Sequence, residues 1–244
     1  MTDERPVLSL VVPVYNEEDN LRPLTEAIRE AMKTVGVTYE VVLTDDGSKD
    51  RSWEIMKQLA AADTRIRVQR FEFNCGETAA SEAGMRAARG QYIVTIDADL
   101  QNDPRDLPGF LEALKTYDVV CGTRVASRGE GDNWIRIASS RIANWVRNKL
   151  SEENITDAGC TYRAFKRECI DKVKLYRGMH RFLPTLFKME GYTVTEIPVT
   201  NNPRLAGESK YGVWNRLFKS FHDLLAVRWM KKRVLNYRVG ERIN

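Results

Sequence analysis

The sequence predicts an α/β protein with a mostly parallel β-sheet flanked by helices, followed by a C-terminal amphipathic helix. Strand-like apolar runs alternate with helical patterns through the first half of the chain. The chain has 244 residues, 43% of them hydrophobic, which is enough to bury a core without disulfides or metals. Acidic residues directly follow several of the predicted strands. Because ligand sites in such sheets lie at the carboxyl ends of strands, those residues are candidates for a functional site.

The first half of the chain contains five predicted strands and four predicted helices. Short apolar runs rich in β-branched residues predict the strands, which are Leu8–Val14, Tyr39–Thr44, Ile66–Phe73, Tyr92–Ile96 and Val119–Cys121. Apolar residues at three- and four-residue spacing predict the helices, which are Asn20–Thr34, a segment around Trp53–Ala60, Thr78–Arg89 and Leu107–Leu114. In the first helix, for example, Leu21, Leu24 and Ile28 share one face.

The rhythm changes after about residue 124. A loop is expected over Arg128–Asp132, an amphipathic helix over Trp134–Leu150 and a strand over Thr193–Val199. A loop rich in Pro, Gly, Ser and Lys follows, and Val213–Leu235 reads as one long amphipathic helix. We therefore expect a main domain over residues 1–203 and an extension over residues 204–244.

The charge is distributed unevenly along the chain. Residues 204–244 hold ten Lys or Arg and three Asp or Glu, a net charge of +7, whereas residues 1–203 carry −3. The overall charge of +4 is too small to indicate a nucleic-acid partner. A basic extension on a mildly acidic body indicates an anionic partner for the extension: a membrane, a phosphate or another protein.

Several classes of protein are disfavoured by what the sequence lacks. No apolar run is long enough to span a bilayer, and the first residues do not read as a signal peptide. The four cysteines show no CxxC spacing and only two histidines occur, so free cytosolic thiols are expected and a zinc site is not. Neither a GxGxxG nor a P-loop motif is present, which leaves dinucleotide and P-loop nucleotide sites without support.

Carboxylates gather at the predicted strand ends. Asp45 and Asp46 follow the second strand, and Asp97 and Asp99 follow the fourth. Extended backbone would place Asp97 and Asp99 on the same side, and with Gln101 they form a hard oxygen set suited to Mg²⁺ or Mn²⁺. The alternative is that these acids are helix caps or solvated turns. Asp103-Pro104 reads as the start of a helix.

In combination, these motifs resemble family 2 glycosyltransferases of GT-A fold, and within them the polyprenyl-phosphate glycosyltransferases of the dolichol-phosphate mannose synthase group. The resemblance covers about residues 7–230. The motifs that carry it are VPVYNE (12–17), DDGSKD (45–50), NCGETAASEAG (74–84), DADLQNDP (97–104), GTR (122–124), MHRF (179–182) and PRLAGESKYG (203–212). It implies a Rossmann-like domain that passes a sugar from a nucleotide diphosphate to a polyprenyl phosphate, with inversion.

The resemblance also implies roles for individual residues. The residues implied to hold the nucleotide sugar are Pro13, Tyr15, Glu17, Asp45, Asp46, Asp97 and Ala98. Asp97, Asp99 and Gln101 would hold Mg²⁺ or Mn²⁺. The residues implied to receive the lipid phosphate are Arg124, Arg141, Arg204, Ser209 and Lys210, with His180 and Arg181 on the acceptor side. Arginine forks suit phosphate oxygens. Arg141 and Arg124 could alternatively be a solvent-facing and a structural arginine.

Asp157 is the remaining candidate for the catalytic group, beside Asp99, Arg124 and Arg141. It lies before a Gly–Arg segment and could orient the acceptor or the sugar, or simply cap a loop. An acceptor phosphate is already ionised at neutral pH and needs little help from a base. Glu77 departs from the family, which often has Lys or Gln there, and Asn201-Asn202 replaces a frequent His pair.

The extension offers a route to a lipid. Aromatic and aliphatic residues at helical spacing in Val213–Leu235, with Lys and Arg between them, are typical of a helix that lies in a membrane interface. The same face could instead pack on the domain or on a sister subunit. We therefore expect a peripheral protein at the cytoplasmic face of the inner membrane, with an integral membrane partner or a homo-oligomer as further options.

Two other functions stay open from the sequence. One is a glycosyltransferase with a glycan or protein acceptor, which would require Asp157 as a true general base. The other is a membrane-recruited nucleotide-binding subunit without chemistry. Nucleotidyl transfer is less favoured, because no Gly/Arg/Lys-rich loop follows the first strand.

Overall fold

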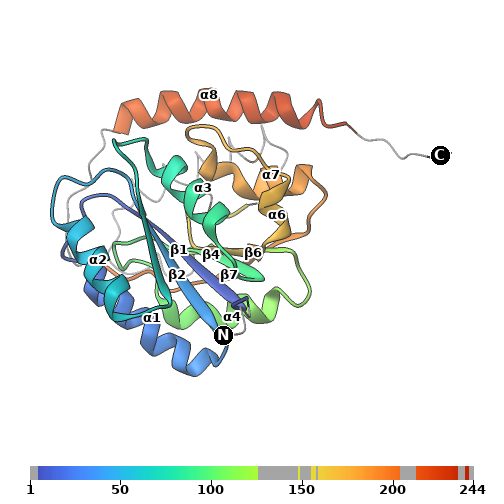
Figure 1. Ribbon diagram of the computed structural model, residues 1–244. Coiled ribbons are helices and arrows are strands. Elements are labelled where there is room, and N and C mark those ends of the chain that lie inside the picture. Colours follow the sequence, from blue (N-terminus) through green and yellow to red (C-terminus); the bar gives the residue numbers. More distant parts are fainter. Residues whose placement is uncertain are drawn as a thin grey trace.

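The computed structural model describes residues 5–125, 148, 155–157, 159–203, 213–235 and 240–241, with the helical backbone alone for 213–220. Helices cover both faces of a central sheet (Figure 1). The strands are β1 Leu8–Val14, β2 Tyr39–Asp45, β3 Ile66–Arg70, β4 Tyr92–Thr95, β5 Val119–Thr123, β6 Arg163–Lys166 and β7 Val194–Pro198. The helices are α1 Leu21–Val35, α2 Ser52–Ala62, α3 Glu77–Ala87, α4 Leu107–Ala113, α6 Glu168–Asp171, α7 Leu183–Met189 and α8 Val213–Lys231, with short 3-10 turns η1 Pro104–Asp106 and η2 Met179–Phe182.

The described strands form one seven-stranded sheet in the order β3-β2-β1-β4-β6-β5-β7. Strands β1 to β4 pair in parallel, and so do β5 and β7. Strand β6 is antiparallel to both of its neighbours, β4 and β5. Chain order reverses between the β2 and β4 sides of β1, and a reversal of this kind is where sheets of this class bind their ligands.

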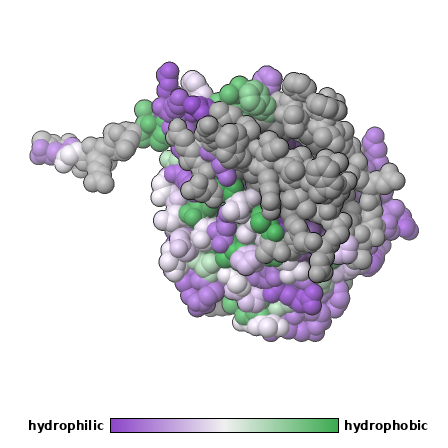
Figure 2. All heavy atoms as spheres, turned by 180° about the vertical axis from the view of Figure 1, so that it is seen from behind, coloured by the Kyte–Doolittle hydropathy of each residue, from purple (hydrophilic) through white to green (hydrophobic). Residues whose placement is uncertain are grey.

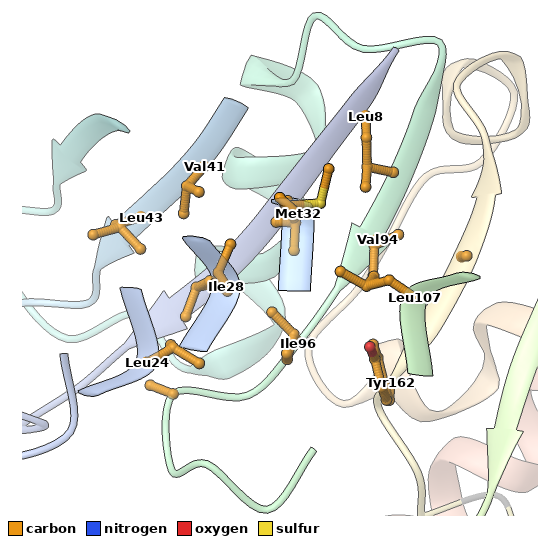
Figure 3. Packing of buried hydrophobic residues seen from close by; sticks show 14 of the residues in the cluster. Leu8, Leu24, Ile28, Met32, Val41, Leu43, Val94, Ile96, Leu107 and Tyr162 are labelled. Atoms are coloured by element: carbon orange, nitrogen blue, oxygen red, sulfur yellow. The ribbon is translucent and has the colours of Figure 1, made fainter. Parts of the chain in front are cut away.

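Alternate residues of β1 enter two separate apolar cores. Leu8, Leu10 and Val12 lie in the core under α1, α2 and α4, whereas Val11 lies in the core under α3, α6, α7 and α8. Successive strand residues point to opposite faces, so a strand buried on both faces needs the continuous apolar run that the sequence shows. In Figure 3, Leu24, Ile28 and Met32 of α1 pack towards the strand residues of the first core.

Asp118 ties the last three strands together at the start of β5. Its carboxylate accepts hydrogen bonds from Lys166 Nζ at 2.7 Å and from the backbone N–H of Thr193 at 2.9 Å. The bond from Lys166 is the main reason why the pKa of Asp118 is lowered to about 2. This carboxylate therefore fixes the register of strands that are distant in the sequence.

Helix α8 packs on the second core. Leu224 and Val227 are buried in the same cluster as the apolar residues of α7. Gly178, with φ +86°, lies against the Asp223 carboxylate so closely that any Cβ would collide with it. The C-terminal helix therefore lies over η2 and α7, across the top of the molecule in Figure 1.

The predicted α/β architecture and C-terminal helix are confirmed, with differences in detail. The third strand ends at Arg70 and not at Phe73, whose side chain is 70% exposed. Strand β6 and helices α6 and α7 were not predicted, because they are short and show little periodicity. The predicted loop 128–132 and almost all of helix 134–150 lie outside the described residues.

The expectations about the cysteines and about membrane-spanning helices can be compared with the structure. All four cysteines are free thiols, as predicted. Among the described residues, no helix combines the length and apolar character that crossing a bilayer requires. The domain boundary at 203 stays a prediction.

Candidate active site

The ends of β1, β2 and β4 form one edge of the sheet, and two residues there have unusual backbone conformations. Asn16, just after β1, and Leu100, after β4, have φ of 54° and 64°. Residues with side chains rarely adopt this left-handed region, and such strain concentrates at functional sites. Asn16 is held by its N–H to Ser48 Oγ at 2.9 Å and by Lys49 N–H to its side-chain oxygen at 2.8 Å.

The segment after β1 carries the predicted nucleotide residues Tyr15 and Glu17, and Pro13 lies within β1 itself. Glu17 is fixed on two sides: its N–H donates to Ser52 Oγ at 2.8 Å, and its carboxylate accepts from Asn20 Nδ2 at 2.7 Å. The sheet thus brings the first and second motifs together, as the strand-end argument predicts.

Asp46 holds a loop that precedes α3. Its carboxylate accepts hydrogen bonds from the N–H groups of Cys75 at 2.6 Å and Gly76 at 2.9 Å, and from Asn74 Nδ2 at 2.8 Å. Burial raises the pKa of Asp46, while the two backbone N–H groups act in the opposite direction. Its neighbour Asp45 is fully buried and lies 3.0 Å from Arg70 Nε. The DDGSKD and NCGE motifs therefore form one structural unit.

Asp97 is half-buried below the carboxyl end of β4. Its carboxylate accepts a short hydrogen bond from the hydroxyl of Thr161. Burial, followed by the negative charges of Glu77 and Asp99, raises the pKa of Asp97 to about 7. A carboxylate in this electrostatic setting is stabilised in its charged form by a nearby cation.

Asp99 reaches the same region by a turn. Strand β4 ends at Thr95, and Ala98 and Asp99 lie in a turn, so the expected extended geometry of Asp97–Asp99 is wrong. The negative charge of Asp99 nevertheless contributes to the raised pKa of Asp97. Asp99 is 8% exposed and accepts a 3.2 Å hydrogen bond from the backbone N–H of Gln101.

The donor atoms around Asp97 fit a hard divalent cation. The carboxylate and amide oxygens that Asp97, Asp99 and Gln101 carry are of the type that Mg²⁺ and Mn²⁺ prefer. The described residues contain no group of three or more His, Cys, Asp or Glu side chains placed to enclose a metal. A metal ion held by two carboxylates and one amide oxygen would keep further coordination positions open for other ligands.

Arg124 and Asp157 form a forked ion pair. Arg124 Nε lies 2.8 Å from Asp157 Oδ2, and Nη2 lies 3.1 Å from Oδ1. The Arg124 side chain is 20% exposed and that of Asp157 is 2% exposed. Burial alone would lower the pKa of Arg124, but the bonds to Asp157 more than offset it and the pKa is raised. The positive charge of Arg124 also acts to lower the pKa of Asp97.

His180 joins η2 to the beginning of α3. Its Nδ1 lies 2.7 Å from Thr78 Oγ1, and its Nε2 lies 3.4 Å from the Glu77 carboxylate. Its carbonyl accepts a hydrogen bond from Arg163 at 2.5 Å. His180 is buried. The positive charge of Arg181 acts to lower the pKa of Asp223 in α8, although burial, the larger effect, raises it.

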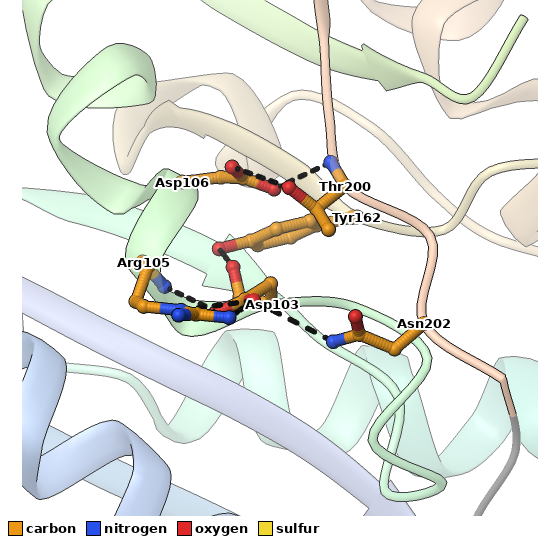
Figure 4. Close-up of polar contacts among 6 residues, drawn as sticks. All are labelled: Asp103, Arg105, Asp106, Tyr162, Thr200 and Asn202. Atoms are coloured by element: carbon orange, nitrogen blue, oxygen red, sulfur yellow. Dashed lines mark hydrogen bonds and ion pairs between the residues drawn. The ribbon is translucent and has the colours of Figure 1, made fainter. Parts of the chain in front are cut away.

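A polar cluster anchors the chain that leaves β7 (Figure 4). Asp103 caps η1 by accepting from the N–H of Arg105 at 2.9 Å, as the Asp-Pro pattern predicts. Asp106 accepts from the N–H of Thr200 at 2.8 Å, and the Tyr162 hydroxyl donates to the Asp103 carbonyl. Asn202 donates its N–H to the carbonyl of Gln101 at 2.9 Å. The segment that the sequence assigns to the acceptor therefore begins beside Gln101.

Four predicted acceptor residues, Arg141, Arg204, Ser209 and Lys210, lie outside the described residues. Sequence reasoning missed Thr161 and Thr78, which bond to Asp97 and His180. Thr161 gave no signal, because its neighbour β6 was not predicted. Thr78 lies inside the NCGETAASEAG motif, which could have indicated a role for it.

A family model described as "Glycosyl transferase family 2" matches residues 9–174. This range includes the strand-end motifs, the Asp97–Asp99 pair and the Arg124–Asp157 ion pair. The chain belongs to glycosyltransferase family 2.

Curated relatives extend over most of this glycosyltransferase. It is 35% identical over 230 residues to the dodecaprenyl-phosphate galacturonate synthase of Rhizobium johnstonii, covering 92% of this chain and 67% of that protein. It is 36% identical over 220 residues to the undecaprenyl-phosphate 4-deoxy-4-formamido-L-arabinose transferase of Edwardsiella ictaluri, covering 89% of this chain and 66% of that protein. The chain thus spans about two thirds of the length of these relatives.

Solved structures confirm the GT-A fold of this family 2 glycosyltransferase. Glucosyl-3-phosphoglycerate synthase from Mycobacterium tuberculosis, in complex with Mn²⁺, UDP and glucosyl-3-phosphoglycerate, has a TM-score of 0.68 at 16% identity, covering 98% of this chain and 84% of that one. The mannosyltransferase of Pyrobaculum calidifontis, in complex with GDP-mannose and Mn²⁺, has a TM-score of 0.63 at 20% identity, covering 96% and 66%.

Proposed function

We propose that this glycosyltransferase moves a sugar from a nucleotide diphosphate to the phosphate of a polyprenyl lipid, with inversion at the anomeric carbon. The observation that carries the proposal is the group of charges at the carboxyl edge of the sheet: the acids Asp97 and Asp99 follow β4, and Arg124, which pairs with Asp157, acts on the same carboxylate of Asp97. The names of the two curated relatives, both polyprenyl-phosphate sugar transferases, support the same substrate class.

The donor would bind along the edge from the β1 and β2 ends to Asp97. Glu17, Asp46 and the loop that Asp46 holds lie on the nucleotide side, and Asp97, Asp99 and Gln101 lie on the diphosphate side. A bound Mg²⁺ or Mn²⁺ would neutralise charge on the diphosphate as it leaves. The Mn²⁺ named for two structures of the same fold agrees with this assignment.

The hydrogen bonds of Asp157 favour a phosphate acceptor over a hydroxyl acceptor. Both of its carboxylate oxygens accept hydrogen bonds from Arg124, which suits Asp157 to position the guanidinium. A guanidinium that is held in this way is suited to recognise phosphate oxygens. An acceptor that is already anionic fits a site arranged for charge neutralisation, whereas a hydroxyl acceptor would require proton removal.

In the proposed reaction, a phosphate oxygen of the lipid attacks the anomeric carbon from the face opposite the nucleotide. The bond between that carbon and the diphosphate oxygen breaks, and its electron pair leaves with the nucleoside diphosphate. Arg124 would hold the two anionic groups together against their repulsion. Holding the reactants in line is the main contribution required of the protein.

We propose that the enzyme reaches the lipid by binding the membrane surface through α8. Phe221, Leu225 and Trp229 repeat every four residues, lie on one side of the helix and are exposed. Basic residues lie next to Trp229 in the sequence, at Arg228 before it and Lys231–Arg233 after it. On the face shown in Figure 2, apolar side chains lie beside hydrophilic ones along the top of the molecule, where α8 runs. Apolar anchors with adjacent cations suit the anionic cytoplasmic leaflet.

A donor panel tests the proposal. The protein is incubated with UDP- and GDP-sugars, Mn²⁺ or Mg²⁺ and undecaprenyl phosphate, and glycolipid is measured by mass spectrometry. We expect transfer from one donor class, lost on chelation of the metal. Failure of every donor to label the lipid would contradict the acceptor assignment.

The Asp157→Asn variant separates the proposal from a glycan or protein acceptor. If Asp157 positions Arg124, the amide retains part of the contact and the variant should keep measurable transfer. Complete loss of activity with retained donor binding would indicate a general base and hence a hydroxyl acceptor. Tight nucleotide binding without metal and without turnover would indicate a binding subunit.

A further inference from the structure

We infer that the amino-terminal edge of the sheet carries a second binding site, for a small free phosphate compound with at least two negative charges. The site is a cavity of about 500 Å³, a volume typical of cavities that bind small molecules. It is lined by the segments Arg5–Val7, Arg89–Gln91 and Lys166–Arg167 and by the acids Glu168 and Asp171.

The three lining segments meet because the strands that they flank are neighbours in the sheet. Tyr92 at the start of β4 pairs with Leu8 at the start of β1 on one side and with Lys166 of β6 on the other. The N–H of Arg167 extends this pairing by donating to the Gln91 carbonyl at 2.9 Å. The sheet itself therefore holds the lining segments in place.

A buried pair of polar side chains fixes the segment that carries Arg89. The Glu40 carboxylate, 5% exposed, accepts hydrogen bonds from the N–H of Arg89 at 2.6 Å and from the Ser9 hydroxyl at 2.7 Å. The N–H of Gly90 donates to the same Ser9 oxygen at 2.8 Å. These bonds use the backbone of Arg89, so they leave its guanidinium available at the cavity.

Four cations and two carboxylates line the cavity. Lys166 pairs with Asp118 at 2.7 Å, and the Arg167 side chain donates to a backbone carbonyl. The side chains of Arg5 and Arg89 are exposed. Within the part of the chain that the structure describes, neither guanidinium has a hydrogen-bond acceptor or an acidic partner. The cavity thus offers two uncommitted arginine forks.

These groups select the class of ligand. Arginine forks match the oxygens of phosphate groups, and the excess of cations favours a ligand with two or more negative charges over a monoanion. The described lining residues include no aromatic side chain on which a nucleobase could stack. A diphosphate or a small organic phosphate therefore fits the cavity better than a nucleotide does.

The position of the cavity favours a free phosphate over a lipid headgroup. Strand β1, seven residues long, begins beside the cavity and ends at the candidate active site, which places the two roughly 20 Å apart. Helix α8 crosses the top of the molecule in Figure 1, whereas the chain begins at the bottom. If α8 meets the membrane, as its proposed role requires, the cavity opens away from the bilayer.

Calorimetric titration of the full chain with pyrophosphate tests the inference. EDTA is present throughout, because diphosphate binding at Asp97 and Asp99 would depend on a metal ion. We expect one saturable site whose affinity falls as salt is added. The dicarboxylate malonate should bind at least about tenfold more weakly than pyrophosphate.

Variants assign the binding to the cavity. Arg5→Gln/Arg89→Gln should weaken pyrophosphate binding by about tenfold or more, because it removes both free arginine forks. Arg22→Gln/Lys57→Gln is the matched control, since it removes two exposed cations that do not line the cavity, and it should bind as the wild type does. Arg124→Gln, at the candidate active site, should also keep the affinity. Thermal unfolding verifies that each variant is folded.

Four outcomes would overturn the inference. The wild type could fail to bind pyrophosphate, or Arg5→Gln/Arg89→Gln could bind it with unchanged affinity. Loss of binding in Arg124→Gln would place the anion in the candidate active site. Malonate bound as tightly as pyrophosphate would contradict the phosphate class.

Vesicles that contain phosphatidic acid distinguish the two sources of phosphate. For a free phosphate ligand, Arg5→Gln/Arg89→Gln should bind these vesicles as the wild type does. A loss of vesicle binding in this variant alone, with the matched control unchanged, would show that the cavity takes a lipid headgroup, and the assignment of a free ligand would be wrong.

Discussion

The pKa of the Asp97 carboxylate depends on the charges that surround it. Burial and two neighbouring acids hold its pKa near 7 in the absence of a cation. Thr161 offers one compensating hydrogen bond, and Arg124 contributes an opposite charge. Ionisation of Asp97 near neutral pH is therefore unfavourable unless a cation compensates its charge.

This predicts a pH-dependent stability for the metal-free protein. A folded pKa of about 7 lies above the ordinary value of 3.8, so the contribution of Asp97 is full at low pH and lost as pH rises through 7. The stability of the wild type should fall relative to Asp97→Asn over that range and then run parallel. Chelator-treated proteins would be compared by thermal unfolding at several pH values.

A control variant and the addition of metal test whether the pH effect is due to Asp97. Glu112→Gln, at an exposed pair with Lys115, should show no such divergence from the wild type. Adding Mn²⁺ should restore the wild type near pH 7 and not the variant. Parallel curves for wild type and Asp97→Asn would contradict the raised pKa.

The backbone conformation of Gly47 and its close approach to Phe73 lead to a second prediction. It has φ +70°, and a Cβ there would lie 2.8 Å from the carbonyl carbon of Phe73, in the backbone next to the loop that Asp46 holds. Gly47→Ala should therefore weaken UDP or GDP binding and cost about 1–3 kcal/mol of stability. Denaturant unfolding and nucleotide titration measure both effects.

Gly36→Ala is the control for backbone conformation alone. Gly36 has the same φ of +70°, but nothing lies within 4 Å of an added Cβ. We expect a cost of about 1 kcal/mol and unchanged nucleotide affinity. Equal effects of the two substitutions on nucleotide binding would show that contact with the Phe73 segment is unimportant.

At the scale of elements, β6 and α8 are the two additions to the parallel sheet that matter for the candidate site and for the surface. Strand β6 runs antiparallel between β4 and β5, so its beginning lies at the edge where the parallel strands end. That direction brings Thr161 to Asp97 and carries the segment with Asp157 to Arg124. Helix α8 uses Leu224 and Val227 to pack on the second core and exposes Phe221, Leu225 and Trp229 elsewhere.

The two sides of α8 should separate membrane binding from stability. Replacing Phe221, Leu225 and Trp229 together by Ser should reduce binding to vesicles that contain phosphatidylglycerol by about tenfold or more, since each loses buried apolar area at the interface. Unfolding should change little. Sedimentation with vesicles, at low and high salt, measures the loss.

Val227→Ala is the matched variant on the buried side. It should lower stability by about 1–2 kcal/mol and leave vesicle binding of the folded protein intact. If the triple variant binds vesicles as well as the wild type does, the exposed side of α8 serves another purpose.

At the scale of the whole molecule, one continuous sheet links the two apolar cores and the site. A ligand at the strand ends contacts segments from both halves of the chain, so its binding should stabilise the protein as a unit. With Mn²⁺, the preferred nucleotide sugar at a hundredfold excess over its dissociation constant should add about 2.7 kcal/mol, a rise in Tm of roughly 5–10 °C.

Differential scanning calorimetry measures this shift and the number of transitions. We expect a single transition that moves as a whole, and no shift from the sugar nucleotide when the metal is chelated. A shift of equal size without metal would argue against Asp97 and Asp99 as its ligands.

The sequence by itself determined the α/β alternation, the C-terminal helix and the acids at the strand ends. These follow from local patterns: continuous apolar runs such as Leu8–Val14, helical spacing in α1, and the fact that a strand-end residue is adjacent in sequence to its strand. The Asp103 cap is likewise a local signal and is present in the structure.

Only the tertiary structure decided how β6 enters the sheet, that Asp157 pairs with Arg124, and that Glu77 is held by His180. These contacts join residues 33 and about a hundred positions apart, and no local periodicity encodes them. The turn at Asp99 departs from extended geometry for the same reason, because Leu100 adopts a left-handed conformation in its tertiary surroundings. Local sequence patterns identify the candidate residues, whereas long-range packing decides which of their side chains come into contact.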